Sequence, residues 1–273
     1  MSKFSVIMPV YGGDNPIHFK QAIQSLQEQT RLPDEIIVVV DGPIQQSTKS
    51  VLDEIKNNRV FKIIYQNKNL GPGVSRSNGI KASNHKIIAL MDSDDISVNC
   101  RFEKQLDVIK NKKVDVVGSW IEEFIKLPSD LKISRRLPEL HSEIYKFGKW
   151  RMPVNNVSLM FKKEVYEKTG GYTNQVRNED WSLVVRMLAS GAIFYNIQET
   201  LVHARAGNDM IRRRRGRDHF LMGLKIFTLM YKLKYINLLR AISNITIRVI
   251  IQFMPIGFTN VLYRYLLRYH EKK

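Results

Sequence analysis

Short apolar runs alternate with helically spaced apolar residues over the first ninety positions of the chain. The runs are rich in Val and Ile and end at polar or turn residues, which is typical of buried strands. Between them, apolar residues recur every three or four positions, as along one face of a helix. The pattern predicts strands at 4–10, 35–41, 60–65 and 87–91, and helices at 17–29 and around 51–55, with a further helix that Gly71-Pro72-Gly73 opens and that runs toward Ile80.

This alternation predicts βαβ units, and therefore a mainly parallel, Rossmann-like α/β sheet flanked by helices. In open sheets of this kind, ligands bind beyond the carboxyl ends of the strands. Tyr11, Asp41 and Asp92 each stand at the end of a predicted strand, and Pro9 lies near the end of the first. Three strands are thus expected to deliver polar side chains to one rim of the sheet.

The middle of the chain is less regular, because Pro138, Pro153 and Gly170-Gly171 interrupt the pattern. A helix is predicted again at 179–190, where the stripe of apolar residues includes Trp181.

From residue 218 to 269, apolar residues run on with spaced Lys and Arg. The longest stretch without a charge, 249–263, has 15 residues, fewer than the ~20 that a helix needs to cross a bilayer. An amphipathic helical extension that lies on a membrane surface is the better interpretation. We therefore expect residues 216–273 to form a basic, membrane-associating extension.

Composition supports a folded protein in a reducing compartment. Hydrophobic residues make up 44% of the 273 positions, enough to fill a core. A single cysteine, Cys100, excludes an internal disulfide framework. The N-terminal residues lack the apolar segment and cleavage site of a signal peptide. A cytoplasmic protein is the expectation.

Basic residues exceed acidic ones by 17, and most of the excess lies at one end. Residues 201–273 hold 15 Lys and Arg against three acidic residues, a net +12. Such asymmetry predicts an anionic partner, which could be membrane lipid, nucleic acid or a diphosphate-bearing substrate. A solvated basic surface is the alternative that composition leaves open.

Three carboxylates fall within four residues at Asp92-Ser93-Asp94-Asp95, directly after an apolar strand. Their mutual repulsion is costly unless a cation compensates it. Oxygen ligands of this kind suit Mg²⁺ or Mn²⁺, whose remaining positions water and substrate phosphates can fill. A helix cap with a solvated acidic turn is the alternative, since Asp is a favoured cap residue.

Four motifs together resemble the inverting glycosyltransferases of family 2, which have the GT-A fold. They are Ser-Val-Ile-Met-Pro-Val-Tyr near the N-terminus, Ile-Ile-Val-Val-Val-Asp-Gly, the segment from Asn69 to Ile80, and Asp-Ser-Asp-Asp. Asn178-Glu179-Asp180-Trp181 resembles the family's Glu-Asp motif, which extends the match over about 200 residues. Asn155-Asn156 stands where many relatives have Asn-His, so the role of that histidine in the family is not assigned to Asn156.

The resemblance implies a GT-A domain over residues 1–215. A nucleotide-binding half would cover about 1–100 and an acceptor half about 101–215. It also implies a donor site in which Asp94, with Asp92, holds Mn²⁺ or Mg²⁺ against the donor diphosphate. The donor-binding side chains are expected to be Pro9, Tyr11, Asp41, Arg76, Asp92, Ser93, Asp95, Arg205 and Arg212. Among them, Tyr11 offers a face to the uracil ring, Asp41 can accept a base N–H, and Arg76 can contact base or phosphate.

The resemblance assigns the catalytic base to Asp180, with Glu179 raising its proton affinity and helping to place hydroxyl groups. The alternative is a pair of ordinary first-turn carboxylates that the helix dipole stabilises. Trp181 could be an acceptor platform or a core residue.

Basic residues follow the last strand-like segment, at Arg205 and at Arg212-Arg-Arg-Arg215. Relatives have a mobile basic segment here, and arginine suits phosphates because it binds them through two parallel hydrogen bonds. A solvated basic loop would explain one or two arginines better than five. His203 could complete the metal shell, although a lone histidine is more often structural.

The resulting hypothesis is an inverting transfer of a hexose, glucose or galactose, from a UDP-sugar to a lipid-diphosphate-linked saccharide. The acceptor would be of the undecaprenyl-diphosphate type, and the product would serve O-antigen or capsule synthesis at the inner face of the plasma membrane. The anionic lipid surface is an expected partner and nucleic acid is not. Two rivals stay open: a nucleotidyltransferase acting on sugar phosphates, and a basic nucleic-acid or membrane binding module without catalysis.

Overall fold

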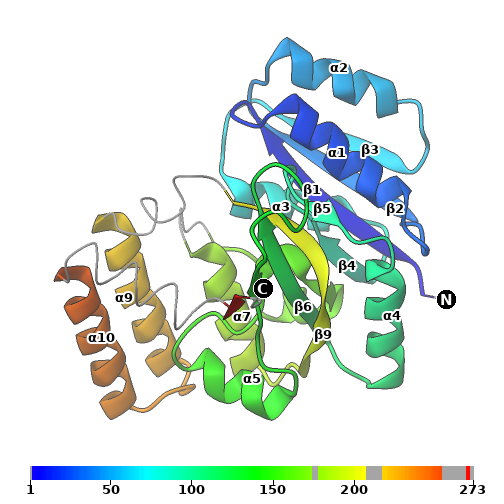
Figure 1. The fold of residues 1–273 in the computed structure, drawn as a ribbon. Helices are drawn as coiled ribbons and strands as arrows, with labels where there is room; N and C mark the ends of the chain where they lie inside the picture. The colour runs from blue at the N-terminus through cyan, green and yellow to red at the C-terminus, as the bar shows by residue number, and fades with distance from the viewer. Residues whose placement is uncertain (1, 174–177, 207–216, 254–268, 271–273) are drawn as a thin grey trace.

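The computed structural model describes residues 2–173, 178–206, 217–253 and 269–270. Helices cover both faces of a central sheet, and two further helices stand beside it (Figure 1). In chain order the elements are β1 (Phe4–Tyr11), α1 (Pro16–Gln27), β2 (Glu35–Asp41), α2 (Gln46–Ile55), β3 (Phe61–Gln66), α3 (Pro72–Ala82), β4 (Ile87–Leu90), β5 (Ile96–Ser97), α4 (Arg101–Asn111), β6 (Val116–Phe124), β7 (Ile133–Arg135), α5 (His141–Gly148), the 3₁₀ turn η1 (Asn156–Ser158), β8 (Met160–Lys162), α6 (Lys163–Lys168), α7 (Glu179–Ala189), β9 (Phe194–Arg205), α9 (Arg217–Lys232), α10 (Leu238–Phe253) and β10 (Tyr269–His270).

The sheet runs in the order β10-β7-β6-β8-β4-β1-β2-β3, with β9 paired to β5 and β6. The long ladders, β1 with β2 and β4, β2 with β3, and β6 with β9, are parallel. The antiparallel pairings are short, and β8 makes two of them where it joins the two halves between β4 and β6. The predicted α/β fold with a mainly parallel sheet is confirmed.

Alternation along the strands divides the core into two layers. In β1, Val6 and Met8 pack with α1, α2 and α4, whereas Ile7 packs on the other face with α3, α5 and α7. Helices cover both faces of the sheet, so the sheet can present polar groups at the carboxyl ends of its strands.

The ends of the predicted helices have local causes. The third helix begins at Pro72, within the predicted Gly71-Pro72-Gly73 opening, because proline suits the first helical turn, where its missing N–H has no partner anyway. The first helix ends at Gln27 rather than Gln29. The buried side chain of Gln29 instead donates to Ser25 O at 2.9 Å and Val98 O at 2.9 Å, which ties the end of α1 to the segment before α4.

The C-terminal helices differ in how much they bury. In α9, Ile226, Phe227 and Met230 are buried against α7, and Phe227 meets Trp181 edge to face at 5.8 Å. Trp181 therefore packs against the core. α10 packs beside α9 and leaves several large apolar side chains exposed. Within the described part of the chain, no helix is long and apolar enough to span a membrane.

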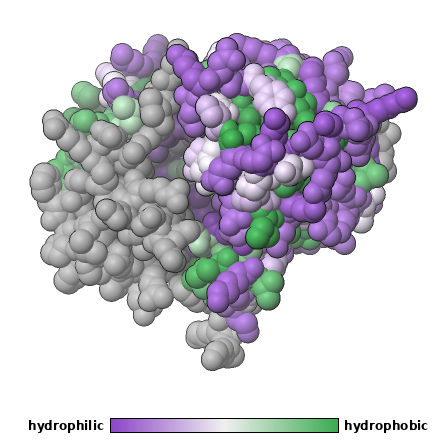
Figure 2. Space-filling model, turned by 90° about the horizontal axis from the view of Figure 1, so that it is seen from above, coloured by the Kyte–Doolittle hydropathy of each residue, from purple (hydrophilic) through white to green (hydrophobic). Residues whose placement is uncertain are grey.

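The face of the molecule seen from above carries mostly hydrophilic side chains, and its hydrophobic ones form small separate patches among the residues that are drawn in colour (Figure 2). Scattered patches of this size are ordinary for a protein surface and need no partner. The exposed apolar side chains of α10 are a different case, because they follow one another along a single helix.

Candidate active site

Loops at the carboxyl ends of β1, β2 and β4 meet at one rim, as the sequence predicts. Tyr11 and Asp41 are register partners at the ends of β1 and β2. The loop after β1 reaches the loop after β4 through Asp14, whose carboxylate accepts a hydrogen bond from Ser93 Oγ at 2.7 Å. The predicted convergence is therefore present in the structure.

Tyr11 and Asp41 occupy this rim in different ways. Tyr11 is 46% exposed, and its ring lies so close to Gly13 that a Cβ there would come within 2.5 Å of it. Asp41 is buried, and its two oxygens accept the backbone N–H groups of Leu70 at 2.7 Å and Gly71 at 2.9 Å. Asp41 thus fixes the loop before α3, while Tyr11 presents an open aromatic face.

The acidic loop after β4 concentrates negative charge. Burial, followed by the charges of Asp92 and Asp14, raises the pKa of Asp94 to about 6. Asp14 is a member of this cluster that the sequence analysis did not single out. Burial is also the main cause that raises the pKa of Asp14. Its position in the loop after the first strand was the signal that could have identified it.

Asp95 is the most deeply buried carboxylate of the acidic loop. It is 4% exposed and accepts the backbone N–H of Arg205 at 2.8 Å, which joins the loop to the end of β9. The Arg205 side chain donates to the Asp94 carbonyl at 3.0 Å and lies 4.4 Å from the ring centroid of Phe124. Burial raises the pKa of Asp95 well above its ordinary value. The contacts of Asp95 and Arg205 hold the loop in place.

A basic residue that was not predicted from the sequence, Arg101, lies beneath the loop. Arg101 is fully buried at the start of α4 and donates to Leu90 O at 2.8 Å and Gln105 Oε1 at 3.1 Å. Burial lowers its pKa to about 9, against the opposing effect of Asp95 and then Asp92. No local pattern distinguishes this arginine from the exposed ones in the sequence.

Arg76 joins the two halves of the rim. Its guanidinium is 5% exposed and donates to Asp92 Oδ1 at 2.7 Å and to Asp180 Oδ1 at 2.9 Å. Glu179 Oε1 lies 3.9 Å from the same guanidinium. From the sequence, Arg76 is expected to contact the base or a phosphate, and in the structure it bridges the acidic loop and the first turn of α7.

Glu179 and Asp180 open α7 at the rim. Glu179 is 7% exposed and packs so closely on Gly73 of α3 that a Cβ there would come within 2.9 Å of its Cγ. Burial and then the charge of Asp180 raise the pKa of Glu179 to about 7. Asp180 has a side chain that is 26% exposed. Burial raises its pKa and Arg76 opposes that rise.

Tyr172 completes the surroundings of Asp180. It is 8% exposed, its ring lies 5.8 Å from that of Tyr166, and Tyr166 Oη accepts its backbone N–H at 3.1 Å. Its pKa is raised well above the ordinary value, first by burial and then by the negative charge of Asp180. The phenol is therefore neutral beside the carboxylate. Sequence reasoning missed this residue.

His203 and Arg212 are two further candidate residues from the sequence. His203 Nδ1 lies 3.1 Å from Glu122 Oε2, and its ring meets that of Phe124 edge to face at 6.5 Å. Burial lowers the pKa of His203. The histidine thus has partners on β6. Arg212 lies outside the described residues.

The donor set fits a divalent cation of the hard class. Within the described residues no group of three or more His, Cys, Asp and Glu side chains forms a metal cage. Mg²⁺ and Mn²⁺ do not require one, because one or two carboxylates with water and substrate phosphates can complete their shell. Asp94, with Asp92 and Asp14 near enough to raise its pKa, is a carboxylate that a cation would stabilise.

Comparison with known proteins gives consistent results. The family model described as Glycosyl transferase family 2 matches residues 5–170. The UDP-Gal:alpha-D-GlcNAc-diphosphoundecaprenol beta-1,3-galactosyltransferase of Escherichia coli is 34% identical over 267 residues, which cover 97% of each chain. The amylovoran biosynthesis glycosyltransferase AmsE of Erwinia amylovora is 31% identical over 95% of this chain and 97% of its own.

The fold also matches a solved structure. That of S. aureus TarS 1-349 in complex with UDP-GlcNAc superimposes with a TM-score of 0.71 at 15% sequence identity, covering 97% of this chain and 76% of that one. At this identity the similarity is one of fold.

Proposed function

Since the chain belongs to glycosyl transferase family 2, we propose that it transfers a hexose, glucose or galactose, from a UDP-sugar to a saccharide carried on a lipid diphosphate, with inversion at the anomeric carbon. The acceptor is of the undecaprenyl-diphosphate type, and the product serves O-antigen or capsule synthesis. The names of the relatives support these choices, because one is a UDP-Gal-dependent transferase acting on a diphosphoundecaprenol-linked sugar and the other serves amylovoran biosynthesis.

The observation that carries the proposal is the bridge made by Arg76. Asp92 and Asp180, which we assign to the donor side and the acceptor side, accept hydrogen bonds from one guanidinium at 2.7 and 2.9 Å. Because the two carboxylates share one buried cation through different nitrogens, one of them can act on the leaving group while the other acts on the attacking hydroxyl. A binding module for anions gains nothing from such a cluster.

On the donor side, the exposed ring of Tyr11 stacks on the uracil, and Asp41 accepts a base N–H with the lone pairs that its backbone contacts leave free. Ser93, Asp95 and Arg205 hold the acidic loop in register, and Arg205 adds positive charge beside it. A Mn²⁺ or Mg²⁺ ion bound by Asp94 and Asp92 would neutralise the charge of the departing diphosphate.

On the acceptor side, Asp180 is the base. An acceptor hydroxyl oxygen forms a bond to the anomeric carbon, the bond from that carbon to the UDP oxygen breaks, and the hydroxyl proton passes to Asp180. UDP leaves with the electron pair of the broken bond. Arg76 favours the ionised form of Asp180, in which it can accept this proton. The pKa of Glu179 is raised to about 7, so this carboxyl is mainly protonated at lower pH, which limits repulsion in the pair.

The enzyme would meet its acceptor at the inner face of the plasma membrane, as a peripheral protein without a nucleic-acid partner. The basic excess of residues 201–273 supports an anionic surface as the third partner.

The test is a donor screen with purified protein, Mn²⁺ and a synthetic GlcNAc-diphosphate-lipid acceptor, measured as acceptor-dependent UDP release. UDP-galactose or UDP-glucose should be the best donor, and NMR of the product should show the inverted anomer. Release of pyrophosphate from UTP and a sugar phosphate would instead identify a nucleotidyltransferase. A salt-sensitive complex with RNA and no UDP release would identify a binding module.

Replacing Asp94 by Ala provides the sharpest test of the metal proposal. We expect transfer to fall by about 10³-fold, because a metal ion supplies several kcal/mol of charge stabilisation to the leaving group. The circular dichroism spectrum should stay unchanged, since Asp94 is partly exposed in a loop. Asp107→Ala, an exposed carboxylate of α4, is the control. Full activity of Asp94→Ala in added Mn²⁺ would refute this role.

A further inference from the structure

Large apolar side chains stand exposed where α9 ends and α10 begins. Leu239 is 79% exposed, Leu238 55%, Ile242 52% and Tyr231 46%. Farther along α10, Ile250 is exposed as well. Side chains of this size and number on one stretch of a soluble surface usually mark a site of interaction.

Charge around these side chains has one sign. From residue 219 to 270 the sequence contains no Asp or Glu. Lys232 and Lys234 are exposed between the two helices, and Lys149 and Arg240 are partly exposed beside them. Apolar side chains interleaved with lysine and arginine are the composition of a segment that lies on an anionic membrane.

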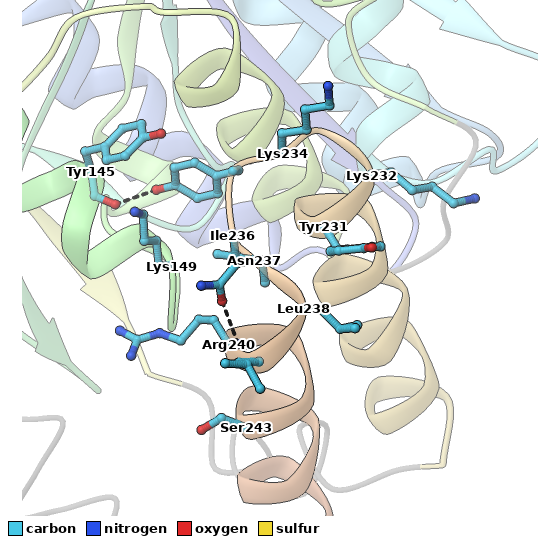
Figure 3. A pocket seen from close by; sticks show the side chains of 12 residues that line it. Tyr145, Lys149, Tyr231, Lys232, Lys234, Ile236, Asn237, Leu238, Arg240 and Ser243 are labelled. Atoms are coloured by element: carbon cyan, nitrogen blue, oxygen red, sulfur yellow. Dashed lines mark hydrogen bonds between the residues drawn. The ribbon is translucent and has the colours of Figure 1, made fainter.

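These cationic side chains line a cavity of about 1130 Å³ between α5 and the α9–α10 turn (Figure 3). Its wall contains Lys149, Lys232, Lys234 and Arg240, and it contains no acidic residue. The cavity is open to solvent and large enough for a phosphate head group.

The wall on the α5 side is held rigidly. Tyr235 packs edge to face on Tyr145 at 4.8 Å and donates its hydroxyl to the Tyr145 carbonyl at 2.6 Å. Asn244 Nδ2 donates to the Lys149 carbonyl at 2.8 Å. Lys149 Nζ lies 4.9 Å from the Tyr145 ring centroid. These contacts fix where the ammonium group is presented.

Arg240, the other partly exposed cation of the cavity, also contacts an aromatic ring. The Arg240 guanidinium lies 3.4 Å from the ring centroid of Trp150, which is itself 40% exposed. A ring contact of this kind orients a cation without neutralising its charge. The positive charge of the cavity therefore remains available to an external anion.

The alternatives fit less well. A second copy in a twofold arrangement would set the same lysines against one another, which is repulsive. A nucleic acid would use the cations and gain nothing from several exposed Leu and Ile side chains. An anionic bilayer can bind both kinds of side chain, because lipid phosphates can pair with the cations and acyl chains can pack against the leucines.

We propose that the α9–α10 turn docks on an anionic phospholipid bilayer, with Leu238 and Leu239 inserted between acyl chains and lipid phosphates bound in the cavity by Lys149, Lys232, Lys234 and Arg240. This inference rests on the proposed function only in that a lipid-linked acceptor brings the enzyme to a membrane. The surface lies on elements other than those of the rim, so the two can be tested separately.

The experiment is sedimentation of the purified full chain with vesicles of phosphatidylglycerol and phosphatidylcholine, at 30 and 70 mol%, or of phosphatidylcholine alone. The wild type should bind the mixed vesicles and bind pure phosphatidylcholine much more weakly. Lys232→Glu/Lys234→Glu should reduce binding by at least about tenfold, since each basic residue near an anionic surface contributes roughly a factor of five. Leu239→Ser should reduce it by about tenfold through lost apolar burial.

Matched controls use exposed positions away from α5, α9 and α10. Lys81→Glu/Lys110→Glu has the same change in net charge, and Leu32→Ser removes a leucine that is 54% exposed. Both should bind vesicles like the wild type. Equal loss in the charge control would mean that net charge alone drives binding and would overturn the proposal.

Three further outcomes would also overturn it: undiminished binding by the turn variants, equal binding to both kinds of vesicle, and a dimer in solution that Leu239→Ser dissociates without affecting vesicle binding. UDP release with a short-chain, water-soluble acceptor should be unchanged in every turn variant. Absence of UDP release by the wild type in that assay would contradict the proposed function, but it would not affect the conclusion drawn from vesicle binding.

Discussion

The rim of the sheet and the α9–α10 turn are both rich in charge, and they use it in opposite ways. At the rim, Arg76, Arg101 and Arg205 are buried or partly buried, and each lies beside carboxylates of the acidic loop or α7. At the turn, lysines stand exposed beside leucines in a cavity without a carboxylate.

The charges at the rim therefore hold the geometry of the site, whereas the charges at the turn are available to bind an external anion. A buried ion pair adds little net stability, but removal of one partner is costly because the other charge is left in a poor solvent. An exposed cation costs little to replace and contributes mainly to long-range attraction. Changes at the rim should therefore affect chemistry and stability, whereas changes at the turn should affect only attachment.

Asp180→Asn should produce the largest effect and would sharpen this contrast. We expect the transfer rate to fall by about 10³–10⁴-fold, because an amide cannot accept the acceptor proton. UDP-sugar affinity, measured by calorimetry, should change by less than about threefold, since Asn keeps a side-chain oxygen that can accept the hydrogen bond from Arg76, and the contact of Arg76 with Asp92 remains. Vesicle binding should be unaltered. A large loss of donor affinity would place the base elsewhere.

Arg76→Ala should be next, and it tests whether one guanidinium holds the rim together. The variant leaves Asp92 and Asp180 facing each other without the cation between them. We expect the free energy of unfolding in urea to fall by about 3–5 kcal/mol, the usual cost of breaking a buried pair.

Arg76→Lys is the matched variant for that experiment. It keeps the charge and loses the fork that reaches two carboxylates at once, so it should recover part of the stability and little of the activity. Lys232→Ala, at the turn, should leave the unfolding free energy within about 0.5 kcal/mol of wild type. Equal stability of Arg76→Ala and the wild type would contradict the bridge.

The sequence predicted the parallel half of the sheet closely because each of its strands is a continuous apolar run. The strand at Glu35–Asp41 has the predicted bounds, and Ile87–Leu90 differs by one residue. The second half was harder to predict, because β8 has only three residues and pairs antiparallel on both sides. Such short strands leave no periodicity to detect.

Candidate site residues were predictable where a strand delivers them and not where the fold brings them from afar. Tyr11, Asp41 and Asp92 lie at the predicted rim. The contact of Arg76 with Asp180 spans 104 positions and depends on how α3 and α7 pack, which no local pattern encodes. Tyr172 and Arg101 were missed for the same reason, since their importance lies in what surrounds them.

Glu179→Gln should have the smallest effect. It separates the contribution of this rim carboxyl to the pH dependence of the unfolding free energy from the contributions of all other groups. The pKa of Glu179 rises from 4.5 in the unfolded chain to about 7 in the folded one. A raised pKa means that the folded protein binds the extra proton, so the contribution to stability is complete below pH 4.5 and is lost as the pH rises to about 7. The loss is at most about 3 kcal/mol, from 1.36 kcal/mol for each pKa unit.

Gln cannot ionise, so Glu179→Gln should lack this component of the pH dependence. Unfolding measured in urea from pH 4 to 9 should show the wild type losing stability relative to Glu179→Gln as the pH rises from about 4.5 through about 7, with a constant difference above about pH 8. Glu143→Gln, an exposed glutamate of α5, should follow the wild-type curve. Parallel curves for wild type and Glu179→Gln would mean that this carboxylate titrates as if in water, and that the rim is less enclosed than its packing against Gly73 indicates.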